Sequence, residues 1–165
     1  MRFGVLAVAT LAACSPGGRG TLHPVASAGV ELTSTHGLPD DTARLSAGDV
    51  TADVTGSWTN TNETVEVSYR TPVPTRFPLN ATSTWQGQAV RASAAWNRSA
   101  PAAGNAIGQP LLEQGRIELA GGATTTVQIE FARPGDDRPA IGDEVSIAVP
   151  MPGGARTVRF RVAAE

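Results

Sequence analysis

The chain of 165 residues contains no lysine, a single cysteine and only two histidines. With Cys14 as its only thiol, one chain forms no internal disulfide, so its fold must be held by packing. His23 and His36, without a second cysteine, argue against a structural zinc site. The net charge of −2 gives no basic surface for nucleic acid.

The motifs that most often carry catalysis are missing as well. The sequence has no Gly-x-Ser-x-Gly elbow, and a Ser-His-Asp arrangement would need His23 or His36 beside an activated serine. Only dispersed carboxylates remain for hydrolytic chemistry, and the sequence indicates no particular pair. We therefore expect no catalytic residues, no cofactor and no enzymatic activity, with a carboxylate hydrolase as the least favoured alternative.

One long hydrophobic run is present, and it lies at the amino terminus. Residues 3–13 carry no charge and follow the single positive charge of Arg2. A run of this length fits the ~7–15 residues of a signal-peptide core and is well short of the ~20 that span a bilayer. The run is therefore interpreted as an export signal that is later removed.

The residues at the end of this run, Leu11-Ala12-Ala13-Cys14, resemble the lipobox of bacterial lipoproteins. The resemblance implies that a diacylglycerol is attached to the Cys14 thiol and that a peptidase cuts before this residue. The protein would then be anchored to a membrane on its extracytoplasmic side. In this family, serine in place of aspartate after the cysteine, here Ser15, favours an outer membrane where one exists. Two or three acyl chains hold a protein firmly, because each buried methylene contributes ~0.8 kcal/mol.

This reading divides the chain into three parts. Residues 1–13 are the signal peptide, and their removal takes one positive charge, so the net charge changes from −2 to −3. Residues 14–29 comprise the lipidated cysteine and a stretch rich in Gly, Pro, Ser and Ala that predicts a flexible tether. Residues 30–165 are expected to form one folded domain.

Within that domain, apolar and polar residues alternate with a period of two, which is typical of antiparallel strands with one buried face. The apolar positions predict strands around residues 50–58, 65–69, 90–96, 127–131, 145–149 and 158–162. Turns are predicted at residues 60–63, at Gly121-Gly122 and at Pro152-Gly153-Gly154, where glycine allows tight hairpins. Seven to nine strands favour an all-β, antiparallel two-sheet sandwich.

The segment from Ile117 to Phe131, in which a strand, a Gly-Gly turn and a Thr/Val-rich strand follow one another, resembles immunoglobulin-like and fibronectin-like domains of bacterial envelopes. The resemblance implies a β-sandwich that presents loops or a sheet edge to a partner. The chain departs from the antibody type because it has no cysteine pair and its lone Tyr69 does not match a tyrosine corner. A transthyretin-like sandwich and a small barrel remain open.

Candidate binding residues are few. Trp58 and Trp96 are in phase with apolar neighbours and are expected in the core, whereas Trp85 has polar neighbours and is the candidate for an exposed, ligand-binding ring. Acidic residues in predicted loops, at 40–41, 136–137 and 143–144, are the only candidates for calcium, and we expect no metal site because such residues usually solvate turns.

Three functions follow, in this order. The first is a non-catalytic module that binds another envelope protein or cell-wall polysaccharide. The second is a small-ligand module for carbohydrate or calcium, through Trp85 or the acidic loops. The third is the hydrolase.

Overall fold

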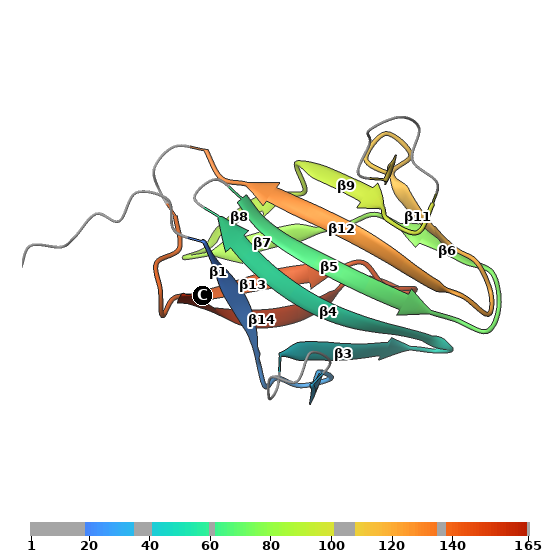
Figure 1. Ribbon diagram of the computed structural model, residues 1–165, viewed down its shortest axis with the longest axis horizontal. Coiled ribbons are helices and arrows are strands. Elements are labelled where there is room, and N and C mark those ends of the chain that lie inside the picture. The colour runs from blue at the N-terminus through green and yellow to red at the C-terminus, as the bar shows by residue number, and fades with distance from the viewer. Residues whose placement is uncertain (1–18, 35–40, 60–61, 101–107, 135–137, 165) are drawn as a thin grey trace, which may run out of the picture.

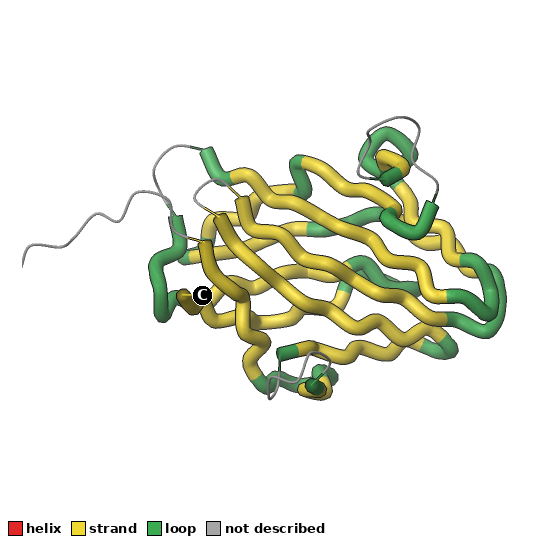
Figure 2. Tube along the Cα trace, viewed as in Figure 1, coloured by secondary structure: helices red, strands yellow, loops and turns green. Residues whose placement is uncertain are grey.

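The computed structural model describes residues 19–34, 41–59, 62–100, 108–134 and 138–164, and residues 1–13, expected to be a signal peptide, and Cys14 lie outside these ranges. All of the described secondary structure is β, and Figure 2 shows strands joined by loops with no helix among them. None of the described residues forms a helix that is long and apolar enough to cross a membrane. The fourteen strands are β1 (Arg19–Val25), β2 (Glu31–Thr33), β3 (Thr42–Ala47), β4 (Val50–Thr59), β5 (Asn62–Arg70), β6 (Thr75–Pro78), β7 (Thr82–Trp85), β8 (Gln88–Arg91), β9 (Ala94–Asn97), β10 (Gln109–Pro110), β11 (Arg116–Leu119), β12 (Thr124–Ala132), β13 (Glu144–Val149) and β14 (Arg156–Ala164).

Twelve of these strands form one curled antiparallel sheet, in the order β10-β9-β12-β5-β4-β1-β14-β13-β7-β8, with β3 also paired to β4 and β2 to β3. The curl is centred on β1, which pairs with the end of β4 through residues 19–22 and with β14 through residues 20–25. Figure 1 shows the two halves of the sheet that β1 joins, with β4, β5 and β12 in one and β13, β14 and β7 in the other. The remaining strands, β6 and β11, form a small second sheet.

The core lies between the two halves and follows the alternation predicted from the sequence. The inward side chains of the long strands are fully buried, among them Val65, Val67 and Tyr69 on β5, Val127, Ile129 and Phe131 on β12, and Val158 and Phe160 on β14. Tyr69 also links the halves, because its hydroxyl donates to the Pro150 carbonyl at 2.8 Å. The small sheet adds Phe77, whose ring meets the Tyr69 ring edge-on at 5.5 Å. The predicted all-β antiparallel class is thus confirmed.

The expected number of strands is too low, because the sequence signal misses most strands of two to four residues and also the longer strands β1 and β3. One expected hairpin is also wrong. Gly121 and Gly122 do form a turn, but the strands on either side of it pair with β6 and β5 and not with each other. The hairpin at Pro152-Gly153-Gly154 is correct: it joins β13 to β14, and both glycines have positive φ.

Residues 19–25, which the sequence placed in the tether, form β1 between β4 and β14. Alternation is hard to see here because the inward positions are Gly20, Leu22 and Pro24, two of which are residues that strands usually avoid. Pro24 is tolerated because β1 pairs with β4 only as far as Leu22, so one side of the strand needs no amide there.

Candidate functional site

Two of the three tryptophans, Trp85 and Trp96, do not lie where the sequence placed them. Trp85 was expected to be exposed, but its side chain is buried, with 7% of the residue exposed. Its ring nitrogen donates to the Asp143 carboxylate at 3.0 Å, and the Arg133 guanidinium lies 5.7 Å from the ring centre. This distance is within the range of a cation–π contact. Trp85 is therefore part of a buried polar network, and the exposed ring expected for ligand binding is absent at this position.

Trp58 is half-buried against the core, and its ring nitrogen donates to the Ala163 carbonyl at 2.9 Å. Trp96 was expected in the core and instead lies on the outer face of β9, because its neighbour Ala95 is the residue that points inward. Just before Trp96 the chain crosses from one half of the sheet to the other. The Ala92 amide donates to the Ala81 carbonyl, beside β7, whereas the Ser93 amide donates to the Glu130 carbonyl on β12. This crossing shifts the alternation by one residue.

The network around Trp85 is built on a buried ion pair between β5 and the end of β12. Arg133 Nε donates to Glu63 Oε1 at 2.6 Å, and the two side chains are only 6% and 5% exposed. Ser83 on β7, fully buried, hydrogen bonds to the same carboxylate and accepts a bond from Arg133 Nη2 at 3.0 Å. Glu63, Ser83 and Arg133 thus satisfy one another and tie the two halves of the sheet together at this end.

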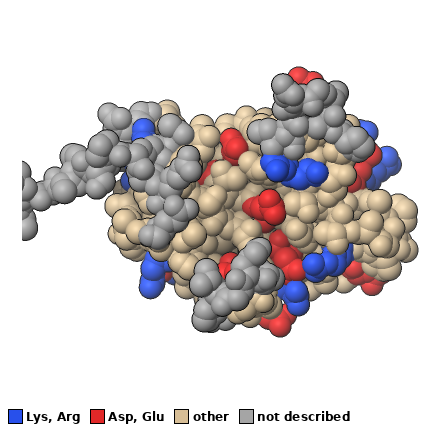
Figure 3. Space-filling view, viewed as in Figure 1, with Lys and Arg blue, Asp and Glu red and all other residues tan. Residues whose placement is uncertain are grey.

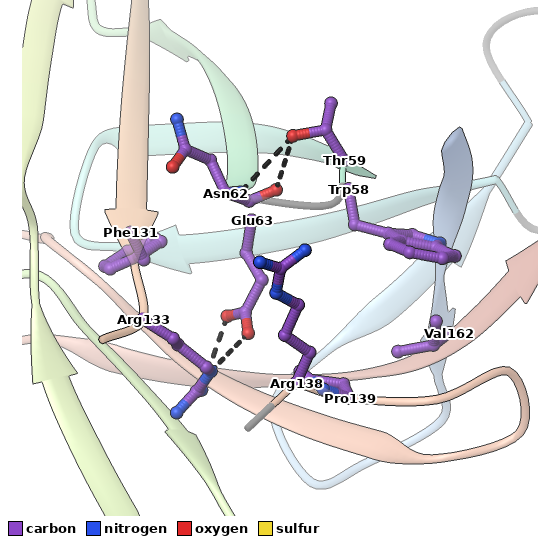
Figure 4. A pocket seen from close by; sticks show the side chains of 9 residues that line it. All are labelled: Trp58, Thr59, Asn62, Glu63, Phe131, Arg133, Arg138, Pro139 and Val162. Atoms are coloured by element: carbon purple, nitrogen blue, oxygen red, sulfur yellow. Dashed lines mark hydrogen bonds and ion pairs between the residues drawn. The ribbon is translucent and has the colours of Figure 1, made fainter. Parts of the chain in front are cut away.

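A narrow pocket opens beside this ion pair (Figure 4), lined among others by Trp58, Phe131, Arg138 and Val162. Its volume is about 20 Å³, which is room for about one water molecule. Because Glu63 and Ser83 are already committed to Arg133, the pocket offers a ligand neither space nor a free buried group. The pocket is best explained as a packing feature of the network.

The other candidates from the sequence are also placed. Asp143 accepts bonds from Trp85 and from the Ala140 amide, and Glu144 is paired with Arg159 and Arg161. Residues 136–137 and Asp40 lie outside the described ranges, as do Cys14 and His36. Among the described residues no three His, Cys, Asp or Glu side chains are grouped as a metal site requires. His23 lies on β1, within hydrogen-bond distance of Thr21.

A second ion-pair cluster lies on the outer face of the half formed by β3, β4 and β5. Asp53 is 7% exposed and binds Arg44 Nε and Arg70 Nη1, both at 2.7 Å. The hydrogen bond from Arg44 is the main cause that holds the pKa of Asp53 below its usual range, and Arg70 adds to it. Both arginines of this cluster are therefore committed to Asp53.

Next to this cluster, the register of four strands aligns Thr55, Glu66, Gln128 and Trp96 in one row, which we call the central row. A shallow hollow lies over it, lined by Thr55, Ser57, Thr64, Glu66 and Gln128. Figure 3 shows acidic side chains in the middle of this face, with basic side chains directly beside them. This row could not be predicted from the sequence, because its members lie on four different strands.

Comparison with known proteins gives no match: no protein-family model, no curated protein and no solved structure is significantly similar to this chain. The functional interpretation therefore rests on the residues themselves.

Proposed function

We propose that this chain is a bacterial lipoprotein, cleaved before Cys14 and anchored through that residue on the extracytoplasmic side of a membrane, where its β domain is a non-catalytic interaction module. The observation that carries the proposal is the uncharged run of residues 3–13 that ends in Leu11-Ala12-Ala13-Cys14, and the structure adds where the first strand begins. β1 begins at Arg19, five residues after Cys14. A lipid anchor and a folded domain would then follow one another almost directly.

This spacing limits how the domain sits on the membrane. Five residues span at most roughly 18 Å when fully extended, so the end of the sheet where β1 begins is held close to the lipid. The ten residues of β4 run along the domain for roughly 30 Å. We call the end with the first residues of β1 and the last of β14 the proximal end, and the end with the β3–β4 and β13–β14 turns the distal end (Figure 1). The distal end and the outer faces are the surfaces open to a partner.

The buried charges support a binding role more than a catalytic one. Glu63 and Arg133 neutralise each other, the buried Asp53 carboxylate is paired with two arginines, and the pocket at the proximal end is too small for a substrate. The partner in this proposal is another envelope protein or cell-wall polysaccharide, and the net charge disfavours nucleic acid. An outer membrane is the expected location where the organism has one.

We further propose that the two halves of the curled sheet act as the layers of an immunoglobulin-like sandwich. The support is the single core that both halves share and the hydrogen bond from Tyr69 on β5 to Pro150 at the end of β13. Such a scaffold carries binding residues on its faces and loops while the core stays fixed.

The anchor is tested by intact mass and membrane fractionation of the bacterially expressed protein, wild type beside Cys14→Ser. The proposal predicts that the wild type loses residues 1–13, gains the mass of two or three acyl chains and sediments with membranes, while the variant gains no acyl mass and loses firm attachment. A wild-type chain without acyl mass and equally soluble as the variant would refute the anchor.

A further inference from the structure

The side chains of the central row do not take part in packing the core. On each of its four strands the flanking inward residues are buried, for example Val54, Val65 and Ala95, so the row itself points outward. With strands about 4.8 Å apart, the row is roughly 14 Å long. It runs across the strands and ends at Trp96, whose ring is half-buried and lies outside the core cluster.

Gln128, in the middle of the row, is held in a fixed orientation. Arg98 Nη1 donates to its side-chain oxygen at 3.0 Å, and its amide nitrogen donates to Glu130 Oε1 at 3.1 Å. One lone pair and one N–H of the amide remain for a ligand. Because these bonds already order the Gln128 amide, a ligand that binds it causes little further loss of side-chain entropy.

Glu66, directly opposite Gln128, is exposed and has no hydrogen bond or ion pair with any described residue. The side chains beside it are short hydroxyl residues, Thr55, Ser57 and Thr64, which leave the hollow open above the strands. The row thus presents an unpartnered carboxylate, an oriented amide, hydroxyls and one indole ring.

We propose that the central row binds an uncharged oligosaccharide chain that lies across β4, β5, β12 and β9. A carboxylate and an amide side by side accept and donate hydrogen bonds to vicinal hydroxyls, while the indole offers a broad apolar surface to the C–H face of a sugar ring. This inference rests on the proposed interaction role and names its ligand class. It also transfers the sugar-binding role expected of Trp85 to Trp96.

The charges on this face select an uncharged chain over an anionic one. Among the described residues that line the hollow, Glu66 carries the charge. The arginines near it lie outside this lining, and their guanidinium groups are hydrogen bonded to Gln128 in the case of Arg98 and to Asp53 in the case of Arg44 and Arg70. An anionic glycan, a phosphate-bearing polymer or nucleic acid in the hollow would meet the Glu66 carboxylate, and none of the described lining residues is a cation that could pair with it.

The experiment is binding of the full lipidated chain, in detergent, to immobilised uncharged glucans, mannans and galactans beside anionic glycans, followed by calorimetric titration of the best binder. Three variants are compared with the wild type: Trp96→Ala, Glu66→Gln, and the control Glu118→Gln, which makes the same chemical change at an exposed site on the small sheet.

The expected result is binding to at least one uncharged glycan, at least ~10-fold weaker for Trp96→Ala, several-fold weaker for Glu66→Gln, and unchanged for Glu118→Gln. Glu66 is exposed, so its variant keeps the fold and tests the site even if Trp96→Ala proves unstable. Binding to anionic glycans only, binding to none, or equal affinity in Glu66→Gln and the wild type would each overturn the proposal. The lipid anchor of Cys14 is measured separately by mass and fractionation, so either proposal can fail alone.

Discussion

Arg133→Met tests the account of the buried network, because it removes the cation and keeps much of the aliphatic chain. Glu63 is then a carboxylate with 5% side-chain exposure and no counter-ion, left with its hydrogen bond to Ser83. Breaking a buried pair by removing one partner costs about 3–5 kcal/mol, and the lost contact with the Trp85 ring adds to this. Because whole domains are stable by only about 5–15 kcal/mol, the variant is expected to be marginally folded.

The assay is urea denaturation of the Cys14→Ser chain with and without Arg133→Met, followed by circular dichroism. The double variant Glu63→Gln with Arg133→Met removes both charges and should recover much of the loss, because a neutral amide is cheaper to bury than a carboxylate. The exposed pair Arg116 and Glu118 provides the control, and Glu118→Gln should change stability by less than about 1 kcal/mol. An Arg133→Met loss as small as that of the control would refute the reasoning.

Three further changes test other parts of the structure. Gly20→Ala should destabilise the sheet by about 1–3 kcal/mol in urea denaturation, because the new Cβ would lie 2.2 Å from Trp58 Nε1. Tyr69→Phe should cost about 1–3 kcal/mol in the same assay, because the buried Pro150 carbonyl loses its donor at 2.8 Å. Hydrogen bonds and ion pairs with its arginines lower the pKa of Asp53 in the folded chain. The stabilisation that the ionised Asp53 contributes is therefore complete above its ordinary pKa of about 3.9 and is lost as the pH falls further. Thermal melts should show this loss of stability in the wild type and lack it in Asp53→Asn.

The controls for these variants are close in the structure. Thr21→Ala changes the outward neighbour of Gly20 on β1 and should have little effect; a harmless Gly20→Ala would mean that this segment is not part of the sheet. Asp49→Asn changes an exposed acid four residues before Asp53, and the loss of thermal stability at acid pH should be the same as in the wild type. If the wild type and Asp53→Asn lost the same stability at acid pH, the role given to Asp53 would be contradicted. A Tyr69→Phe variant as stable as the wild type would contradict the role given to Tyr69.

The long strands were predictable because each buries a regular series of branched or aromatic side chains. On β5 the order Val65, Val67, Tyr69 with polar residues between them leaves only one way to bury the apolar face. β1 was not predictable, because Gly20 and Pro24 occupy its inward positions and hide the alternation. A strand can be fixed by its neighbours in the sheet even when its own side chains give a weak signal.

The candidate sites depend on contacts between residues that are far apart in the sequence. Glu63 and Arg133 are 70 residues apart and meet only because β5 and β12 are neighbours. Trp96 was misassigned for a local reason: the crossing between Ala92 and Ser93 shifts the phase of the alternation, so Trp96 turns outward. Polar neighbours did not make Trp85 an exposed residue, since in a strand they lie on the opposite face.

The most direct test of an anchored domain held close to a membrane is its orientation. In the proposed lipoprotein the Cys14 thiol carries the lipid, so a single introduced cysteine can carry a fluorophore. Ile141, 65% exposed, lies near the proximal end, and Val73, 53% exposed, near the distal end. In vesicles whose lipid headgroups bear a nitroxide, the account predicts strong quenching at Ile141→Cys and weak quenching at Val73→Cys. Equal quenching at both sites, or stronger quenching at Val73→Cys, would contradict it.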